Sequence, residues 1–354
     1  MLAADSKIVS GPATGTLSAR PVYSWKQIID PVEPFLEIVN HRLANQVEAF
    51  DSNLSPYADY ALNGQGKHLR PALVALTANA LGKVNDSHIT VAVIIEMVHL
   101  ATLVHDDVMD EAEIRRGQLT VAANWGNEIA VLFGDCLFAR ALALAASFPT
   151  PEICRAVALA TNTVCSGEIL QNQHRCDFEF TREKYFKVLE MKTAELFALS
   201  CDLSALLSDA PVEPRAGLRA FGLAFGTAYQ VYDDCLDLFG SESTAGKSLG
   251  TDLTKGKLTL PILAALERAD AADRERLQGL ISAWQPGSLK RILKLLAKYD
   301  GLEASLAAVR HYLEQARRML VALPLSDGRA GLLGLTDHLA HQTDALGTAS
   351  ESSL

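Results

Sequence analysis

The chain has 354 residues and a formal net charge of −10, with 49% hydrophobic and 21% charged residues. This composition excludes a disordered or low-complexity protein, and the acidic balance argues against a nucleic-acid partner bound through a general basic field. An aromatic content of only 6%, with abundant Ala and Leu, favours an all-α protein.

Helical patterns fill the chain between two tails. We expect a single helical domain over residues 25–345, flanked by flexible tails at 1–24 and 346–354. The longest irregular stretch inside the domain runs from 240 to 257, and long loops in compact helical domains are often functional. Helices are predicted, in chain order, at 38–50, 71–81, 87–109, 127–147, 151–173, 182–207, 214–239, 261–269, 287–299, 302–323 and 328–345.

The sequence points to the cytoplasm. Residues 1–20 lack the basic region and apolar run of a signal peptide. The longest apolar run, at 92–104, contains Glu96 and His99 and is shorter than the roughly 18 residues of a membrane span. The 6 cysteines include no CxxC pair and are expected to be reduced thiols. We therefore expect a cytoplasmic protein that is not an integral membrane protein.

Two acidic clusters of the form Asp-Asp-x-x-Asp stand out. On a helix, positions i and i+4 share one face, so the outer carboxylates of each cluster repel each other in mainly apolar surroundings. A single cluster could be a solvated helix end, but two copies favour neutralisation by divalent cations. Mg²⁺ suits such oxygen ligands and is usually shared with substrate phosphates. The clusters are Asp106, Asp107 and Asp110, and Asp233, Asp234 and Asp237.

Basic residues are interleaved with these clusters. Arg offers bidentate geometry for a diphosphate and Lys offers a point charge. Each basic residue alone would be an ordinary surface charge, but together with the carboxylates they indicate a site for a metal-bridged diphosphate. They are Lys67, Arg70, Arg115, Arg116, Lys192, Lys247, Lys255 and Lys257.

This combination resembles the trans-isoprenyl diphosphate synthases, which lengthen allylic diphosphates head-to-tail with isopentenyl diphosphate. The likeness covers roughly residues 63–263 and includes several motifs in the family's order. These motifs are the Gly-Lys-x-x-Arg-Pro element at 66–71, the first aspartate cluster with its Arg-Arg-Gly trailer at 105–117, Lys-Thr-Ala at 192–194, Gln-Val-Tyr-Asp-Asp at 230–234 and the segment 246–261.

The resemblance implies an isoprenoid synthase-type helical bundle around a central cavity, a homodimer, and three Mg²⁺ ions with diphosphate bound. It implies metal binding by both aspartate clusters. It places the allylic diphosphate on Arg115, Lys192, Lys247 and Lys257, and isopentenyl diphosphate on Lys67, Arg70, His99 and Arg116. Thr193 and Gln230 would turn oxygens toward the developing allylic cation, and Asp106, Asp107, Asp110, Lys192, Thr193, Gln230 and Asp233 are the expected catalytic set.

In this family the growing chain extends along the helix that carries the first cluster. Ala101 and Thr102, five and four residues before Asp106, are small, and a Phe or Tyr there would block the tunnel early. With Val98 below them they form the expected floor, which favours an all-trans product of C25 to C50. A floor set by Met97, Val98, Phe133 or Phe138 would instead give a geranylgeranyl or shorter product.

Other readings fit the sequence less well. A class I terpene cyclase normally pairs its aspartate-rich motif with a different second motif. A regulatory subunit of a heteromeric prenyltransferase usually lacks intact aspartate clusters, whereas both are intact here. His105, beside Asp106, is expected to hydrogen-bond in support of the site rather than to act as a base. Residues 332–354 contain no Arg or Lys, unlike the basic end of many members.

Overall fold

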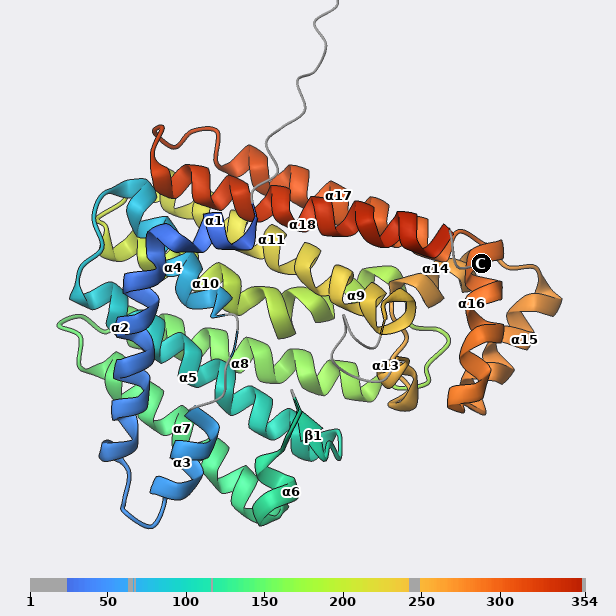
Figure 1. Cartoon of the computed structure of the whole chain (residues 1–354), viewed down its shortest axis with the longest axis horizontal. Coiled ribbons are helices and arrows are strands. Elements are labelled where there is room, and N and C mark those ends of the chain that lie inside the picture. Colours follow the sequence, from blue (N-terminus) through green and yellow to red (C-terminus); the bar gives the residue numbers. More distant parts are fainter. Residues whose placement is uncertain (1–23, 63–65, 67, 116, 242–248, 352–354) are drawn as a thin grey trace, which may run out of the picture.

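The computed structural model describes residues 24–62, 66, 68–115, 117–241 and 249–351, which fold into a bundle of helices and one small hairpin (Figure 1). The predicted all-α class is confirmed. The α-helices are α1 (Trp25–Ile29), α2 (Glu33–Ala44), α3 (Ser55–Leu62), α4 (Leu69–Leu81), α5 (Asp86–Met109), α6 (Val121–Trp125), α7 (Asn127–Ala146), α8 (Glu152–Gln173), α9 (Arg182–Leu189), α10 (Glu195–Leu207), α11 (Val212–Phe239), α13 (Thr251–Thr254), α14 (Leu260–Arg268), α15 (Ala271–Ser282), α16 (Leu289–Lys298), α17 (Gly301–Met319) and α18 (Asp327–Glu351).

Shorter elements connect these helices. Turns of 3-10 helix are η1 (Asp30–Val32), η2 (Asn45–Ala49) and η4 (Pro286–Ser288), and a π-helical turn, η3 (Glu190–Ala194), joins α9 to α10. Strands β1 (Ile114–Arg115) and β2 (Gln118–Leu119) pair antiparallel across a turn in which Gly117 has a φ of 78°.

Two long helices organise the core. α5 begins at a capping box, in which Asn85 and His88 satisfy each other's backbone N–H groups, and packs against α4, α7 and α10. α11 packs against α10 and α17. The carboxyl ends of α5 and α11 carry the two aspartate clusters, so the packing of the bundle decides whether the clusters meet.

The long helices were predicted in the right order, whereas several short elements were missed. These are α1, α3, α6, α13, α15 and the β-hairpin, of which α13 lies in the stretch 240–257 that was expected to be irregular. α3 and α6 are too short for a clear apolar period, and aromatic contacts hold them together instead. The rings of Tyr57 and Tyr60 on α3 meet Trp125 on α6 edge-to-face, with centroids 5.2 and 5.0 Å apart.

The C-terminal tail was wrongly placed. We expected an irregular chain from residue 346, but α18 continues to Glu351, and Leu346 is buried. Gly347 allows α18 to approach Leu306 of α17 closely, since a Cβ there would lie 3.1 Å from a Leu306 methyl group. At the other end Ser24 caps α1 by accepting a hydrogen bond from the Gln27 N–H. Residues 1–23 and 352–354 lie outside the described part of the chain.

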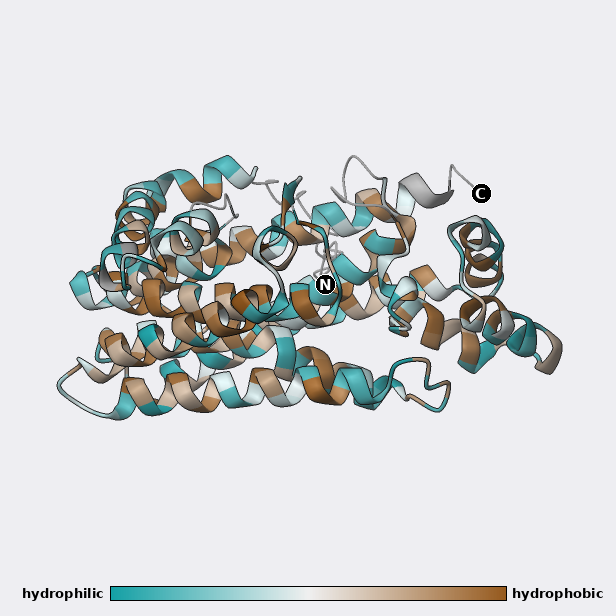
Figure 2. Ribbon diagram, turned by 90° about the horizontal axis from the view of Figure 1, so that it is seen from below, coloured by the Kyte–Doolittle hydropathy of each residue, from teal (hydrophilic) through white to brown (hydrophobic). Residues whose placement is uncertain are grey.

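Apolar and polar segments alternate along the helices (Figure 2). Two helices, α5 and α7, are nevertheless long and apolar enough to cross a membrane by length and composition alone, contrary to the expectation that no segment is. Most of the α5 stretch is buried inside the bundle, as befits a core helix, whereas only a third of the α7 stretch is buried.

Candidate functional site

The two aspartate clusters lie together at one end of the bundle. The first ends α5, and the second lies in the last two turns of α11. The segment after α11 brings Lys255 and Lys257 back to the first cluster, where each ammonium group lies within 3.2 Å of Asp110 Oδ2. The structure therefore brings together motifs that are more than 100 residues apart in sequence.

Each aspartate of the first cluster faces its own cations. Asp106 Oδ2 lies 3.7 Å from Lys192 Nζ. Asp107, which is buried, accepts hydrogen bonds from Arg115, whose Nε lies 2.8 Å from Asp107 Oδ1. The chain turns back directly after α5, where Glu111 has a φ of +49° and the Ala112 N–H donates to the Asp107 carbonyl at 2.9 Å, and this turn lets Arg115 reach Asp107. Three cations surround Asp110, namely Arg175, Lys255 and Lys257.

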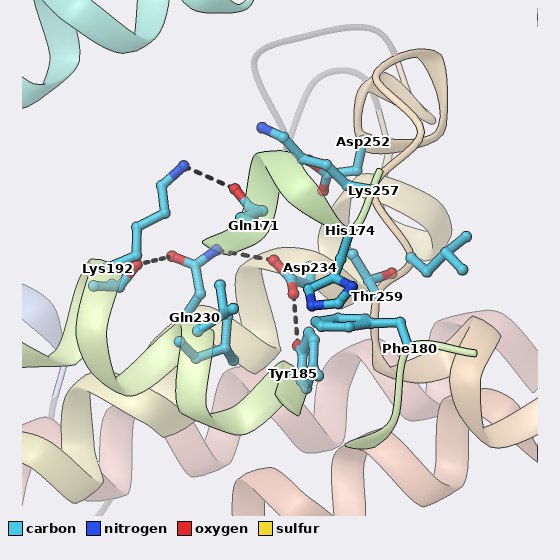
Figure 3. Close-up of a pocket in the computed structure, with 14 residues that line it drawn as sticks. Gln171, His174, Phe180, Tyr185, Lys192, Gln230, Asp234, Asp252, Lys257 and Thr259 are labelled. Carbon is cyan, nitrogen blue, oxygen red and sulfur yellow. Dashed lines mark hydrogen bonds between the residues drawn. The ribbon is translucent and has the colours of Figure 1, made fainter. Parts of the chain in front are cut away.

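The π-helical turn η3 connects to both clusters through side chains, and Figure 3 shows Lys192 of this turn reaching Gln171 and Gln230 reaching Asp234 of the second cluster. From this turn Lys192 pairs with Glu168 and donates to Gln171 Oε1 at 3.0 Å. The next residue, Thr193, donates to Gln230 Oε1 at 3.0 Å. The turn presses on α8 at Gly167, where a Cβ would lie 2.8 Å from the Lys192 backbone nitrogen. Only glycine permits this close approach of the two helices.

Asp234 of the second cluster is buried and doubly hydrogen-bonded. Gln230 Nε2 donates to Asp234 Oδ1 at 2.9 Å, and the Tyr185 hydroxyl donates to Asp234 Oδ2 at 2.6 Å. Burial, reinforced by the charges of Asp252 and Asp233, raises the pKa of Asp234 to about 8. Metal-free folded protein thus favours a protonated Asp234 at neutral pH.

The same effect acts more weakly on the first cluster. Burial raises the pKa of Asp106 to about 6, since it outweighs the opposing charge of Lys192. At Asp110 the balance is reversed. Burial would raise the pKa of Asp110, but Lys257 and Lys255 lower it below its ordinary value. Asp106 and Asp234 are therefore the carboxylates whose ionisation most needs added positive charge.

The stability of the metal-free protein should depend on pH through Asp234. The unfolded chain releases this proton near its ordinary pKa of 3.8, whereas the folded protein keeps it to about pH 8. The folded state binds more protons in this window, so its stability should fall as pH rises from 5 to 9. In EDTA, the Tm of wild type should fall by about 2 °C more per pH unit than the Tm of the Asp234→Asn variant. Equal slopes for the two proteins would contradict this assignment.

Asp237 is used differently from its counterpart Asp110. It is fully buried, and its carboxylate accepts hydrogen bonds from the Thr251 and Asp252 N–H groups and from the Thr251 hydroxyl. In addition, the Gly250 N–H donates to the Asp237 carbonyl at 2.7 Å. The structure thus places Asp237 at the start of α13 as a cap, while Asp233 is half-buried one turn earlier on α11.

Two of the residues expected to bind isopentenyl diphosphate are described, and they are Arg70 at the start of α4 and His99 on α5. Arg70 stacks on Phe197, with its guanidinium carbon 4.8 Å from the ring centroid. Glu96, which the sequence showed only as an interruption of an apolar run, lies 3.5 Å from the Nδ1 atom of His68. Burial would raise the pKa of Glu96, but the hydrogen bond from His68 and the charges of His99 and Arg70 hold it near 2. Lys67, Arg116 and Lys247 lie outside the described residues.

The expected floor residues lie along α5 below Asp106. Val98 and Ala101 are buried, and Thr102 is half-buried, with its hydroxyl donating to the His99 carbonyl at 2.7 Å. His105, also on α5, packs over Gly134 of α7, and its Nε2 atom lies 3.0 Å from the Val131 carbonyl oxygen.

Sequence reasoning missed three residues of this site, namely Glu96, Tyr185 and Arg175. For Glu96 a signal existed, because an acidic residue inside an apolar helix requires a partner. Tyr185 and Arg175 carry no such local signal. They are recognisable only from the long-range packing of α9 on α11 and of the chain after α8 on α5.

Comparisons with known proteins agree with this geometry. The polyprenyl synthetase family matches residues 51–298. The chain is 34% identical over 310 residues to the octaprenyl diphosphate synthase of Escherichia coli, covering 86% of this chain and 95% of that protein. It is 36% identical over 278 residues to an all-trans-nonaprenyl-diphosphate synthase (geranyl-diphosphate specific) of Rhodobacter capsulatus, covering 78% and 85% of the two proteins.

A solved structure supports the same relationship. The polyprenyl synthase of Caulobacter crescentus, complexed with calcium and isoprenyl diphosphate, superposes with a TM-score of 0.85 at 32% identity, over 91% of this chain and 99% of that one. The family predicted from the sequence motifs is therefore confirmed. The chain belongs to the polyprenyl synthetase family and is a trans-isoprenyl diphosphate synthase.

Proposed function

We propose that this enzyme condenses isopentenyl diphosphate head-to-tail with an allylic diphosphate and makes an all-trans polyprenyl diphosphate of C25 to C50. One observation carries the proposal. Adjacent residues of η3 connect the two acidic clusters, since Lys192 contacts Asp106 and Thr193 is joined through Gln230 to Asp234. A diphosphate bound between the clusters would leave its allylic carbon beside these side-chain oxygens.

The donor set fits Mg²⁺. Among the described residues no three acidic, His or Cys side chains converge closely enough to hold an ion alone. This is typical of Mg²⁺, which binds through one or two carboxylates and completes its shell with water and substrate phosphates. We propose that Asp106, Asp107, Asp110 and Asp233 supply these carboxylates and that three ions bind with the diphosphate. When bound, the ions stabilise the charge that develops on the departing diphosphate.

The protein's own groups supply the rest of the proposed chemistry. Lys192, Arg115 and Lys257, together with Lys247, neutralise the leaving diphosphate, and such fixed charges need no reorganisation during ionisation. The Thr193 and Gln230 oxygens face the cation, and the half-buried setting limits water. The isopentenyl double bond attacks this cation, and a proton then leaves to the released diphosphate. Arg70, His99, Lys67 and Arg116 hold the isopentenyl diphosphate.

We propose different roles for Asp234 and Asp237. The hydrogen bonds of Asp234 to Tyr185 and Gln230 would orient it behind the metal site, where an ion would lower its raised pKa. Asp237 would bind an ion only after releasing the start of α13. We therefore assign Asp237 to holding this segment in place.

A product assay tests the function. Purified protein would be incubated with Mg²⁺, labelled isopentenyl diphosphate and, separately, C5, C10, C15 and C20 allylic primers, and the dephosphorylated products would be sized. Products of C25 or longer are expected. Products that stop at C15 or C20 would assign a short-chain farnesyl or geranylgeranyl diphosphate synthase instead. No elongation from any primer would refute the enzymatic proposal and favour a cyclase or a regulatory subunit.

We further propose a cytoplasmic homodimer that pairs through α7 and α8. A helix that is apolar on all sides is normally covered on all sides, yet two thirds of the apolar stretch of α7 is not buried. Large apolar side chains are exposed on both helices, which pack against each other, namely Val131, Leu132, Leu159 and Ile169. A second copy of the chain would cover these side chains, so the exposed apolar face of α7 can be explained without a membrane.

Sedimentation velocity tests the dimer. Wild type should sediment at about twice the chain mass of 38.2 kDa. The double variant Leu132→Asp, Leu159→Asp should shift toward the monomer, because charged groups are costly in an apolar interface. The matched control is the double variant Val321→Asp, Leu325→Asp, which places the same two charges at exposed positions between α17 and α18. A monomeric wild type would refute the dimer.

A further inference from the structure

Three cationic side chains surround Asp110, which is more positive charge than its single carboxylate can neutralise. Arg175 Nη2 lies 3.0 Å from Oδ1, and Lys255 and Lys257 lie 3.0 and 3.2 Å from Oδ2. Only Lys257 has a role in the proposed function. Arg175 and Lys255 therefore form a further pair of cations at Asp110. Lys255 was among the basic residues noted in the sequence, but the family resemblance assigns a substrate to neither residue.

Both cations are held in place by the backbone around them. The Cys176 N–H, next to Arg175, donates to the carbonyl of Gly256, next to Lys255, at 2.8 Å. Gly256 has a φ of +66°, and a Cβ there would lie 2.4 Å from Cys176 Sγ. The two chain segments thus meet at a junction that only glycine permits. The side chains of Arg175 and Lys255 are 30% and 22% exposed, so neither is a freely solvated surface charge.

This arrangement is incompatible with a metal ion on Asp110. Mg²⁺ binds a carboxylate oxygen at about 2.1 Å, and ammonium groups near 3 Å from the same oxygen would be strongly repelled. Both carboxylate oxygens are occupied in this way, Oδ1 by Arg175 and Oδ2 by the two lysines. A metal must therefore displace these cations. The diphosphate binds together with the metal, and the displaced cations can then pair with its negative charge.

We propose that Arg175 and Lys255 are diphosphate-binding residues that occupy Asp110 in the metal-free enzyme and transfer to the diphosphate when Mg²⁺ binds. The proposal rests on the proposed function and deepens it. Arg175 suits this transfer, because its guanidinium can pair with a carboxylate or with phosphate oxygens in the same planar geometry. Its Nε is also buried without a hydrogen-bond partner, which leaves one donor available for the new ligand.

The proposal predicts two effects of opposite sign. In the double variant Arg175→Gln, Lys255→Gln, Mg²⁺ alone should bind about tenfold more tightly, because Lys257 is then the one remaining cation of the three that compete for Asp110. Inorganic diphosphate, added at saturating Mg²⁺, should bind about tenfold more weakly, because two of its cations are gone. If Arg175 and Lys255 only stabilised the fold through their ion pairs with Asp110, their loss would not change the two affinities in opposite directions.

Isothermal titration of the full-length protein with MgCl₂, and then with diphosphate in saturating Mg²⁺, measures both affinities. The control, Lys83→Gln with Arg291→Gln, removes one Lys and one Arg at exposed positions and should match wild type. Tighter Mg²⁺ binding with unchanged diphosphate binding would overturn the transfer, and so would weaker binding of both or no change in either. If wild type itself bound no diphosphate with Mg²⁺, the proposed function would fail first.

Discussion

Replacing Asp106 by Asn should lower kcat for elongation by about 10³-fold while leaving the protein folded. Asp106 lies 3.7 Å from Lys192 and is proposed to share an ion with the diphosphate. Its loss would remove a metal ligand at the point where the leaving group gains charge, and such groups contribute factors of about 10²–10³ or more. The rate would be measured with labelled isopentenyl diphosphate and saturating primer.

Thermal unfolding separates lost chemistry from lost folding. Because the pKa of Asp106 is raised to about 6, the metal-free fold favours an uncharged side chain there. Asp106→Asn should therefore keep or raise the Tm of the metal-free protein. Asp59→Asn, at an exposed position on α3, is the matched control and should be fully active. An active Asp106→Asn enzyme would remove the first cluster from the proposed metal site.

Ala101→Phe should shorten the product from C25 or longer to C15 or C20. Ala101 is fully buried on α5, five residues before Asp106, so a benzyl group there would project into the space that the growing tail is proposed to fill. Inserting a large side chain into a packed core costs about 1–3 kcal/mol, so some loss of Tm is expected. Sizing the products of the same elongation assay gives the result.

Two further variants make the test specific. Ala101→Leu is smaller and should give an intermediate product. Ala92 is also fully buried on α5 but lies nine residues earlier, on nearly the opposite face of the helix. Ala92→Phe should therefore reduce stability without changing product length. An unchanged product from Ala101→Phe would move the floor to another residue, such as Phe133 of α7, which is also buried.

The sequence was most informative where function depends on short spacings. The i, i+4 aspartates and the Lys-Thr pair at 192–193 could be recognised locally, and the structure places them together. It was least informative where a contact joins distant segments. The reach of Arg115 to Asp107 depends on the turn that follows α5, where Glu111 has a φ of +49° and the Ala112 N–H donates to the Asp107 carbonyl, and no apolar period in the sequence predicts this turn.

Asp110 and Asp237 show the limit most clearly. They occupy the same position in identical motifs, so spacing alone gives them the same role. In the folded chain Asp110 faces the cations of the site, whereas Asp237 caps α13. What separates them is the segment that follows each helix: a hairpin after α5 and a returning helical turn after α11. Neither segment's path is encoded in the motif itself.

The cap on Asp237 has a consequence for how the chain can vary. Gly240 ends α11 by donating to the Leu236 carbonyl, and ten residues later Gly250 donates to the Asp237 carbonyl, so both ends of the intervening stretch are tied to the same turn of α11. Closing a longer loop between fixed ends costs little free energy. Insertions and deletions between these two glycines therefore leave Lys255 and Lys257 in place, and the proposed role of Lys247 is what restricts the length of this stretch.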